Sequence, residues 1–282
     1  VTLGASTAVS GTLTQTAGNI AVGSYTLTVN NTHVAGTNVV SGAGGYTLAS
    51  GATLQTQNTS GVGGTITTTT KTLNTAANYT FDGSSAQVTS TTMPATVNNL
   101  TINNSAGVTL SQATTANGTL TLTSGTLAVG ANTLTLNGPT IAGTPANLST
   151  TSSSSLVFGG SSSGVNIPSS VTALNNLTIN NTNGVTLNSS PTISGTLTLT
   201  SGAFGVGTNT LTLNGTVSAT SGSITSSATG TVIYGSGSAQ TILAANYGNL
   251  TSSGAGARTL ASFGTVGVAG TFTPGTNSYT IT

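Results

Sequence analysis

Residues 98–138 read NNLTINNSAGVTLSQATTANGTLTLTSGTLAVGANTLTLNG, and residues 175–215 read NNLTINNTNGVTLNSSPTISGTLTLTSGAFGVGTNTLTLNG. The two stretches align without a gap, and the second begins 77 residues after the first (175 − 98 = 77). Polar and apolar residues alternate in both, most clearly from Gly118 to Thr123 and from Gly195 to Thr200. A period of two residues puts every Leu on one face and every Thr on the other, which indicates β-strands.

Shorter copies of the same pattern open and close the chain. Residues 1–31 align with the sequence from Val108 onward, and the last copy begins at Tyr247. A second element, an aromatic strand followed by Gly, Ser and Ala-Gln, recurs at residues 79–87 and 232–240. We therefore divide the chain into four modules, which are residues 1–97, 98–174, 175–247 and 248–282.

Modules of this length predict several stacked coils each. Coils of stacked strands span about 20–25 residues, so a module holds three or four of them and the chain about a dozen. Strong helix formers are scarce, whereas Thr, Val, Asn and Gly are abundant. We predict an all-β chain that folds as a single parallel β-helix (β-solenoid) rod, with Leu, Val and Ile stacked inside. The alternative is a β-sandwich, which also has short alternating strands but explains the repetition less well.

The composition excludes most catalytic and metal-binding chemistry. The charged residues are Lys71, Arg258 and Asp82, His33 is the single histidine, and there is no Cys. General acid–base catalysis needs two or more titratable groups, and zinc or calcium sites need several ligands. A net charge of +1 offers no field for nucleic acid, and no apolar run is long enough to span a membrane. We predict no enzyme activity, no cofactor, no metal site, no nucleic-acid partner and no membrane insertion.

The combined pattern GS-AQ, NLT, GTLTLTSG and NTLTLNG resembles the β-strand-repeat regions of very large secreted bacterial surface proteins, of the filamentous-haemagglutinin and autotransporter-passenger types. The resemblance covers nearly the whole chain and is closest at residues 98–136 and 175–213. It is weakest at residues 32–72 and 139–170. It implies an extracellular or cell-surface location and a structural or adhesive role, with surface glycans as a candidate partner.

The two ends of the chain suggest how such a protein could assemble. The chain opens on a Val-Thr-Leu element and closes on Tyr-Thr-Ile-Thr, with no evident polar cap at either end. Open solenoid ends expose strand edges, and contacts that do not close produce filaments. We expect copies to join head to tail as the subunits of a filament used in surface attachment or biofilm matrix; the alternative is a stalk segment of a larger adhesin. The residues expected at the joint are Val1, Thr2, Leu3, Phe272, Tyr279, Thr280, Ile281 and Thr282.

The isolated titratable residues have simple expected roles. His33 follows a turn and is expected to be an ordinary surface or turn residue. Lys71 and Asp82 could meet as an exposed ion pair, which would contribute about 0–1 kcal/mol. Arg258 is expected on a loop or at the interface, where its fork could bind carbonyl oxygens. The scattered aromatic residues are expected to fill the core rather than to bind sugars.

Ice binding is a second alternative function, because rows of Thr on a flat solenoid face can order water. The Thr-X-Thr pairs are Thr12/Thr14, Thr119/Thr121, Thr133/Thr135, Thr196/Thr198 and Thr210/Thr212. These pairs do not recur on every coil, and Pro139, Pro145 and Pro168 would interrupt a flat face. A carbohydrate-active β-helix enzyme is excluded, because glycosidases need two carboxylates and the chain has one.

Overall fold

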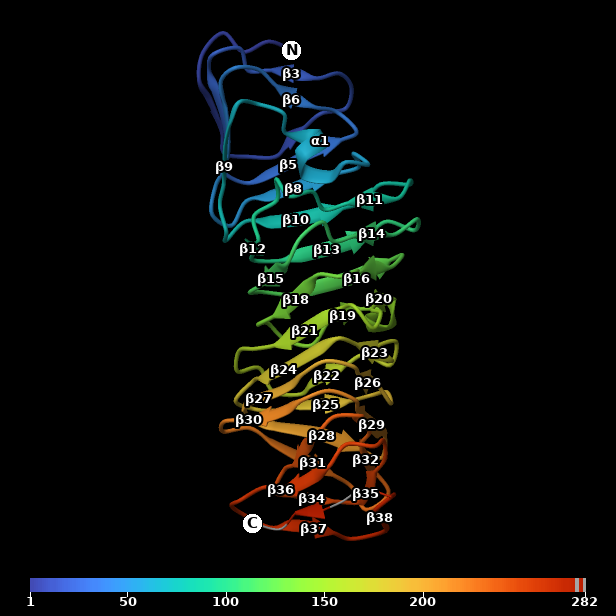
Figure 1. Ribbon diagram of the computed structural model, residues 1–282. Helices are drawn as coiled ribbons and strands as arrows, with labels where there is room; N and C mark the ends of the chain where they lie inside the picture. The colour runs from blue at the N-terminus through green and yellow to red at the C-terminus, as the bar shows by residue number, and fades with distance from the viewer. Residues whose placement is uncertain (277–278, 281–282) are drawn as a thin grey trace. The chain divides into compact units, whose positions relative to one another are not determined.

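A computed structural model of the chain describes residues 1–276, 279 and 280. The strands form a β-solenoid of about 13 turns, which confirms the predicted fold class. The chain divides into two compact units, unit 1 with Val1–Ala128 and Ile141–Asn147 and unit 2 with Val129–Thr140 and Leu148–Thr282. Figure 1 labels the helices and strands of both units. The four modules read from the repeats are a different division and stay a prediction.

Unit 1 consists of coils of three short strands, with one helix in a strand's place. The helix α1 (Gly61–Thr65) is followed by Ile66, which bridges in parallel to Val40, and unit 1 also holds the short 3-10 helix η1 (Pro145–Asn147). The strands of unit 1 are β1 (Thr7–Val9), β2 (Leu13–Thr14), β3 (Ile20–Ala21), β4 (Thr26–Val29), β5 (Thr32–Gly36), β6 (Val40–Ser41), β7 (Gly45–Leu48), β8 (Thr53–Thr56), β9 (Thr70–Leu73), β10 (Asn78–Phe81), β11 (Gln87–Val88), β12 (Thr96–Val97), β13 (Leu100–Asn103), β14 (Val108–Thr109), β15 (Thr114–Ala116), β16 (Leu120–Ser124), β17 (Leu127–Ala128) and β19 (Ala142–Gly143).

Unit 2 is built in the same way. Its strands are β18 (Thr133–Leu136), β20 (Leu148–Ser149), β21 (Ser155–Phe158), β22 (Val165–Ile167), β23 (Ala173–Leu174), β24 (Asn176–Asn180), β25 (Val185–Leu187), β26 (Thr192–Ile193), β27 (Leu197–Ser201), β28 (Ala203–Gly207), β29 (Thr210–Leu213), β30 (Val217–Ala219), β31 (Ser223–Ser226), β32 (Thr231–Tyr234), β33 (Gln240–Ile242), β34 (Ala245–Tyr247), β35 (Asn249–Ser252), β36 (Arg258–Leu260), β37 (Val266–Val268), β38 (Phe272–Thr273) and β39 (Tyr279–Thr280).

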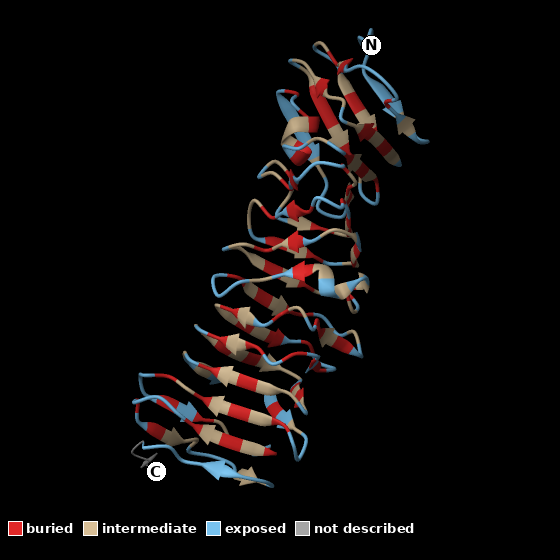
Figure 2. Cartoon of the chain, turned by 90° about the vertical axis from the view of Figure 1, so that its right-hand side faces the viewer, coloured by how far each residue is buried: buried red, intermediate tan, exposed pale blue. Residues whose placement is uncertain are grey.

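Parallel pairing places similar residues of successive coils above one another. β24 lies between β21 and β27, so that Leu156, Leu177 and Leu197 stack in one inward row, with all three buried. The outward residues between them, such as Thr178, are half-buried, so buried and less buried residues alternate along the strands (Figure 2). Burying a Leu side chain stabilises by about 1.5–3 kcal/mol. The predicted inward Leu rows therefore supply the core.

The sequence repeat spans eleven strands. The NNLTI element forms β13, β24 and β35, and the aromatic element forms β10, β21 and β32 (24 − 13 = 35 − 24 = 11, and likewise for the aromatic set). From β10 onward, paired strands are three places apart, as are β29 and β32, so eleven strands are one short of four coils. Within unit 2, β24 therefore lies in the sheet β18-β21-β24-β27-β30, whereas its copy β35 lies in the sheet β23-β26-β29-β32-β35-β38. Each repeat thus rotates onto a different sheet.

Candidate functional site

The first coil carries the predicted joint residues at the start of the chain. Val1 is 86% exposed, Thr2 is exposed, and Leu3 is half-buried. The residues that correspond to Val1 in the next two copies, Val108 and Val185, are each only 2% exposed. The first coil thus leaves open to solvent the apolar positions that internal coils bury.

A hollow of about 320 Å³ opens in this coil. β1 and β2 each lie at an edge of their sheets in unit 1, where one side of the backbone has no strand beside it. Such edges are templates for a further strand. The apolar residues that line the hollow are Val1, Leu3, Val9, Leu13, Ala17, Ile20 and Leu27.

The predicted joint residues near the end of the chain lie in edge strands of unit 2 or outside the described residues. Phe272 is 46% exposed and pairs with Leu250 from β38, the last strand of its sheet. Tyr279 and Thr280 form β39, which pairs with β36. Ile281 and Thr282 lie outside the described residues. The contact between this edge and the first coil of another copy stays a prediction.

A three-bond clasp recurs just before β13, β24 and β35, which lie in three different sheets. In unit 2, the Thr196 amide donates to Oδ1 of Asn176 at 2.8 Å, the Leu177 amide donates to the Thr196 carbonyl at 3.0 Å, and the Gly195 amide donates to the Asn175 carbonyl at 2.8 Å. A Cβ on Gly195 would lie 2.5 Å from Oδ1 of Asn175 and 2.6 Å from that of Asn176. The Asn of one coil therefore requires the Gly of the next.

The same clasp occurs in two other coils. In unit 1, Thr119 donates to Oδ1 of Asn99 at 2.7 Å, and Gly118 has the two Asn side chains against it. In unit 2, Thr271 donates to Oδ1 of Asn249 at 2.9 Å, beside Gly270. The spacing of 20 to 22 residues from Asn to Thr is the length of one coil. The clasp therefore accounts for the recurrence of NNLT and GT in the sequence.

Gly11 and Thr12 are the corresponding residues of the first copy. Both are exposed, and a Cβ on Gly11 would have no atom within 4 Å. Thr12 stands in the first copy where Thr119 stands in the second (119 − 12 = 107). The sequence interpretation missed this pair, although the recurrence of GT one coil after NNLT was the signal that could have found it.

The prediction for His33 was wrong. It is fully buried in β5, where it pairs with Leu13 and Leu54 in an inward row. Its Nδ1 lies 2.9 Å from the Tyr46 hydroxyl and its Nε2 lies 2.7 Å from Oε1 of Gln15. Burial lowers the pKa of His33 from 6.5 to about 4, so the imidazole is neutral at pH 7. It serves as a hydrogen-bonded core residue.

Arg258 is buried completely, and its fork binds carbonyl oxygens as expected. Its terminal nitrogens donate to six backbone carbonyls, among them those of Tyr234 at 3.0 Å and Ser236 at 2.9 Å. The planar guanidinium suits this role because it offers five donors in a fixed geometry. It ties two successive coils of unit 2 together, rather than lying on a loop or at an interface.

Lys71 and Asp82 each have another partner. Nζ of Lys71 donates to the Thr68 carbonyl, and Oδ2 of Asp82 accepts from Nε2 of Gln55. These contacts are structural, within unit 1.

The aromatic residues mostly fill the core, as predicted. Tyr234 and Tyr247 are buried, share a hydrogen bond of 2.9 Å between their hydroxyls, and pack edge to face. Burial raises the pKa of both. The large exposed aromatic side chains of the described residues are Tyr25, Phe263 and Phe272, and the sugar-binding role stays a prediction.

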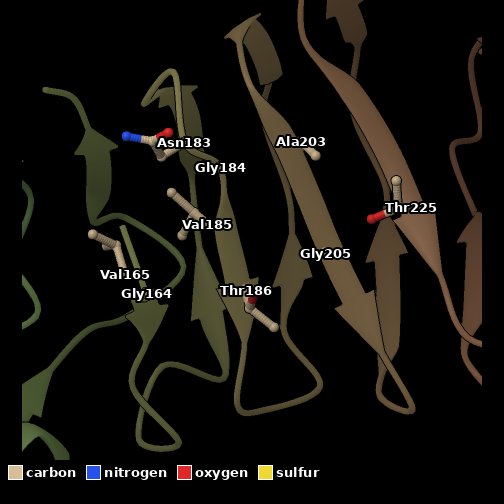
Figure 3. Close-up of a pocket in the computed structure, with 9 residues that line it drawn as sticks. All are labelled: Gly164, Val165, Asn183, Gly184, Val185, Thr186, Ala203, Gly205 and Thr225. Atoms are coloured by element: carbon tan, nitrogen blue, oxygen red, sulfur yellow. The ribbon is translucent and has the colours of Figure 1, made fainter. Parts of the chain in front are cut away.

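A small groove of about 150 Å³ crosses the outer side of β22, β25, β28 and β31 in unit 2 (Figure 3). Its polar lining side chains are Asn183, Thr186 and Thr225, and Gly184 and Gly205 line it without side chains. None of the nine lining residues is ionisable. The groove has no group for proton transfer.

No protein-family model, no curated protein and no solved structure matches the chain. The resemblance to bacterial surface repeats therefore stays a prediction. Among the described residues, no helix is both long and apolar enough to cross a membrane.

Proposed function

We propose that the chain is a non-enzymatic, extracellular structural protein that acts as the subunit of a filament, in which copies join head to tail through the edges of their solenoids. The observation that carries the proposal is the open first coil, where Val1 is 86% exposed while its counterpart Val108 is 2% exposed. A parallel coil set against β1 and β2 would bury this surface and add ladder hydrogen bonds.

The edge strand β38 of a second copy has a suitable pattern. Its Phe272 is inward and Thr273 outward, since they pair with Leu250 and Thr251, and β2 has Leu13 and Thr14 in the same order. Stacking β2 on β38 would continue both rows. A net charge of +1 gives little repulsion between copies. A cell-surface attachment fibre or biofilm matrix is the use that fits such a polymer.

Negative-stain electron microscopy with sedimentation velocity tests the proposal. The purified chain should form unbranched fibres of constant width in plain buffer, and Thr14→Lys should shorten them, because an edge lysine opposes strand addition. The matched control is Thr123→Lys, which changes an exposed Thr of the internal strand β16. Monodisperse single chains at high concentration would overturn filament formation and leave the adhesin-stalk role as the better proposal.

Ice binding is kept as a second candidate because of one outward row in unit 2. Thr192, Thr212, Ile233, Thr251 and Thr273 follow one another on successive strands from β26 to β38. The chain would then slow ice recrystallisation, and Thr212→Lys would remove the effect. Unchanged recrystallisation in the presence of the wild-type chain would exclude this candidate.

A further inference from the structure

The strand β9 forms an open sheet edge in the middle of unit 1. It is the last strand of the sheet β1-β4-β7-β9, although the chain continues from it into β10. The strand three places later, β12, pairs with β15 in a different sheet. Residues 70–72 are exposed and Leu73 is half-buried, whereas Tyr46 and Leu48, which pair with this strand from β7, are fully buried. The open edge therefore arises from a change of sheet within the chain.

The backbone of β9 presents ladder groups on its open side. The Thr70 amide donates to the Gly44 carbonyl, on the side of β7, at 3.2 Å. The direction of hydrogen bonding alternates along a strand, so Lys71 and Leu73 turn their amides and carbonyls away from β7. Among the described strands, β9 pairs with β7 alone. A further parallel strand would take up these groups.

Lys71 determines which kind of strand fits this edge. It occupies an inward position of β9, and its ammonium group donates to the Thr68 carbonyl, which uses one of its three donors. The other cationic side chain, that of Arg258, is buried. The single side-chain carboxylate, that of Asp82, accepts from Gln55 instead. The charge of Lys71 is therefore suited to a carboxylate from another molecule.

We propose that β9 is a docking site for an extended acidic protein segment, which adds as a parallel strand with a carboxylate facing Lys71 and an apolar side chain facing Leu73. Opposite charges on directly facing residues stabilise a pair of strands, and like charges destabilise it. A second copy of β9 in the same register would place a lysine against Lys71. The lysine thus admits an acidic strand and opposes pairing between copies at this edge.

The test is a titration of fluorescein-labelled TTTETLNTA with the full chain in low-salt buffer. This peptide has the sequence of residues 68–76 with Glu in place of Lys71, so that addition in register puts its Glu opposite Lys71. We expect saturable binding that weakens with added salt. The isomeric peptide TTETTLNTA, whose Glu would face Thr70, should bind roughly threefold to fivefold more weakly, the effect of one exposed ion pair.

Reversing the charge on the chain gives the most direct test. Lys71→Glu should bind TTTETLNTA at least about tenfold more weakly. It should bind TTTKTLNTA, the sequence of residues 68–76, more tightly than the wild-type chain does, a gain that misfolding cannot produce. Lys71→Gln should weaken the binding of TTTETLNTA roughly threefold to fivefold. Thr123→Glu is its matched control, since it makes the same change in net charge at an exposed residue of β16, and it should bind as the wild type does.

Three results would overturn the inference: no binding of TTTETLNTA up to about 1 mM chain, equal binding of the two isomeric peptides, or tighter binding of TTTKTLNTA by the wild-type chain. The last result would make β9 a contact between copies. The filament proposal rests on β1, β2 and β38 and has a separate readout. A chain that forms fibres without binding TTTETLNTA excludes this site and retains self-assembly, and a chain that binds the peptide and stays monomeric does the reverse.

Discussion

At the scale of single residues, His33 couples the stability of unit 1 to pH. Burial lowers its pKa from 6.5 to about 4, so the unfolded chain binds a proton more readily than the folded one between these values. Stability is therefore complete above pH 6.5, falls as the pH drops, and levels off below about 4. The full loss is roughly 3 kcal/mol.

Urea unfolding at pH values from 4 to 8 checks this prediction, with His33→Leu as the comparison. Leu13 and Leu54 flank His33 in its row, so leucine fits the site while leaving the Tyr46 hydroxyl without its His33 partner. The variant should be less stable at pH 8 but should lose much less stability on acidification. Equal acid sensitivity in both chains would show that His33 is not the group responsible.

Arg258 stabilises unit 2 through its geometry. The corresponding residues of the other copies are Val108 and Val185, yet valine here would leave the carbonyls of Tyr234 and Ser236 without the donors they now have. We expect Arg258→Val to lower the free energy of unfolding by at least about 3 kcal/mol. Arg258→Lys should also destabilise, since an ammonium cannot span the six carbonyls. Unfolding in urea measures both, and full stability of the lysine variant would show that charge alone suffices.

At the scale of the structural element, the clasp between coils predicts that alanine destabilises the chain at one glycine and not at another. Gly195→Ala should destabilise, because its Cβ would lie 2.5 Å from Oδ1 of Asn175. Gly11→Ala should leave the free energy of unfolding unchanged within about 0.5 kcal/mol, because the site is open. Asn176→Leu should cost about 1–2 kcal/mol by leaving the Thr196 amide unpaired, whereas Asn176→Asp keeps an acceptor there. Thermal unfolding separates the four variants; equal effects of the two alanines would contradict the clasp.

The strands were predictable from sequence to the extent that alternation and repetition were regular. The Leu rows and parallel stacking follow from the copies at 98–138 and 175–215, where each inward position recurs. The burial of His33 was not predictable, because it depends on which residues stack above and below it, in the irregular stretch 32–72. The helix α1 was missed for the same reason, since Gly-Val-Gly-Gly-Thr has low helix propensity and helical structure there depends on its neighbours.

At the scale of the whole molecule, the eleven-strand repeat predicts that one repeat can be removed. Deleting residues 98–174 would place β24 three strands after β10. In the intact chain β24 pairs with β21, and β10 and β21 are copies of the same aromatic element. β10 already pairs with the NNLTI strand β13 in this way. The shortened chain should fold with the same far-ultraviolet circular dichroism per residue and a cooperative unfolding transition. An unfolded or aggregated product would show that the copies are not interchangeable.

The rotation of the repeat from sheet to sheet bears on how chains can lie beside one another. In unit 2 a surface feature carried by β24 reappears on another face with β35, much as a mark on a screw thread moves around the shaft. If two such units lay side by side, a contact made by one repeat would not recur at the next repeat, because the same residues would then lie on another face. The repeat therefore does not produce a regular lateral contact between units. Sideways bundling into sheets of solenoids therefore gains nothing from the repeat.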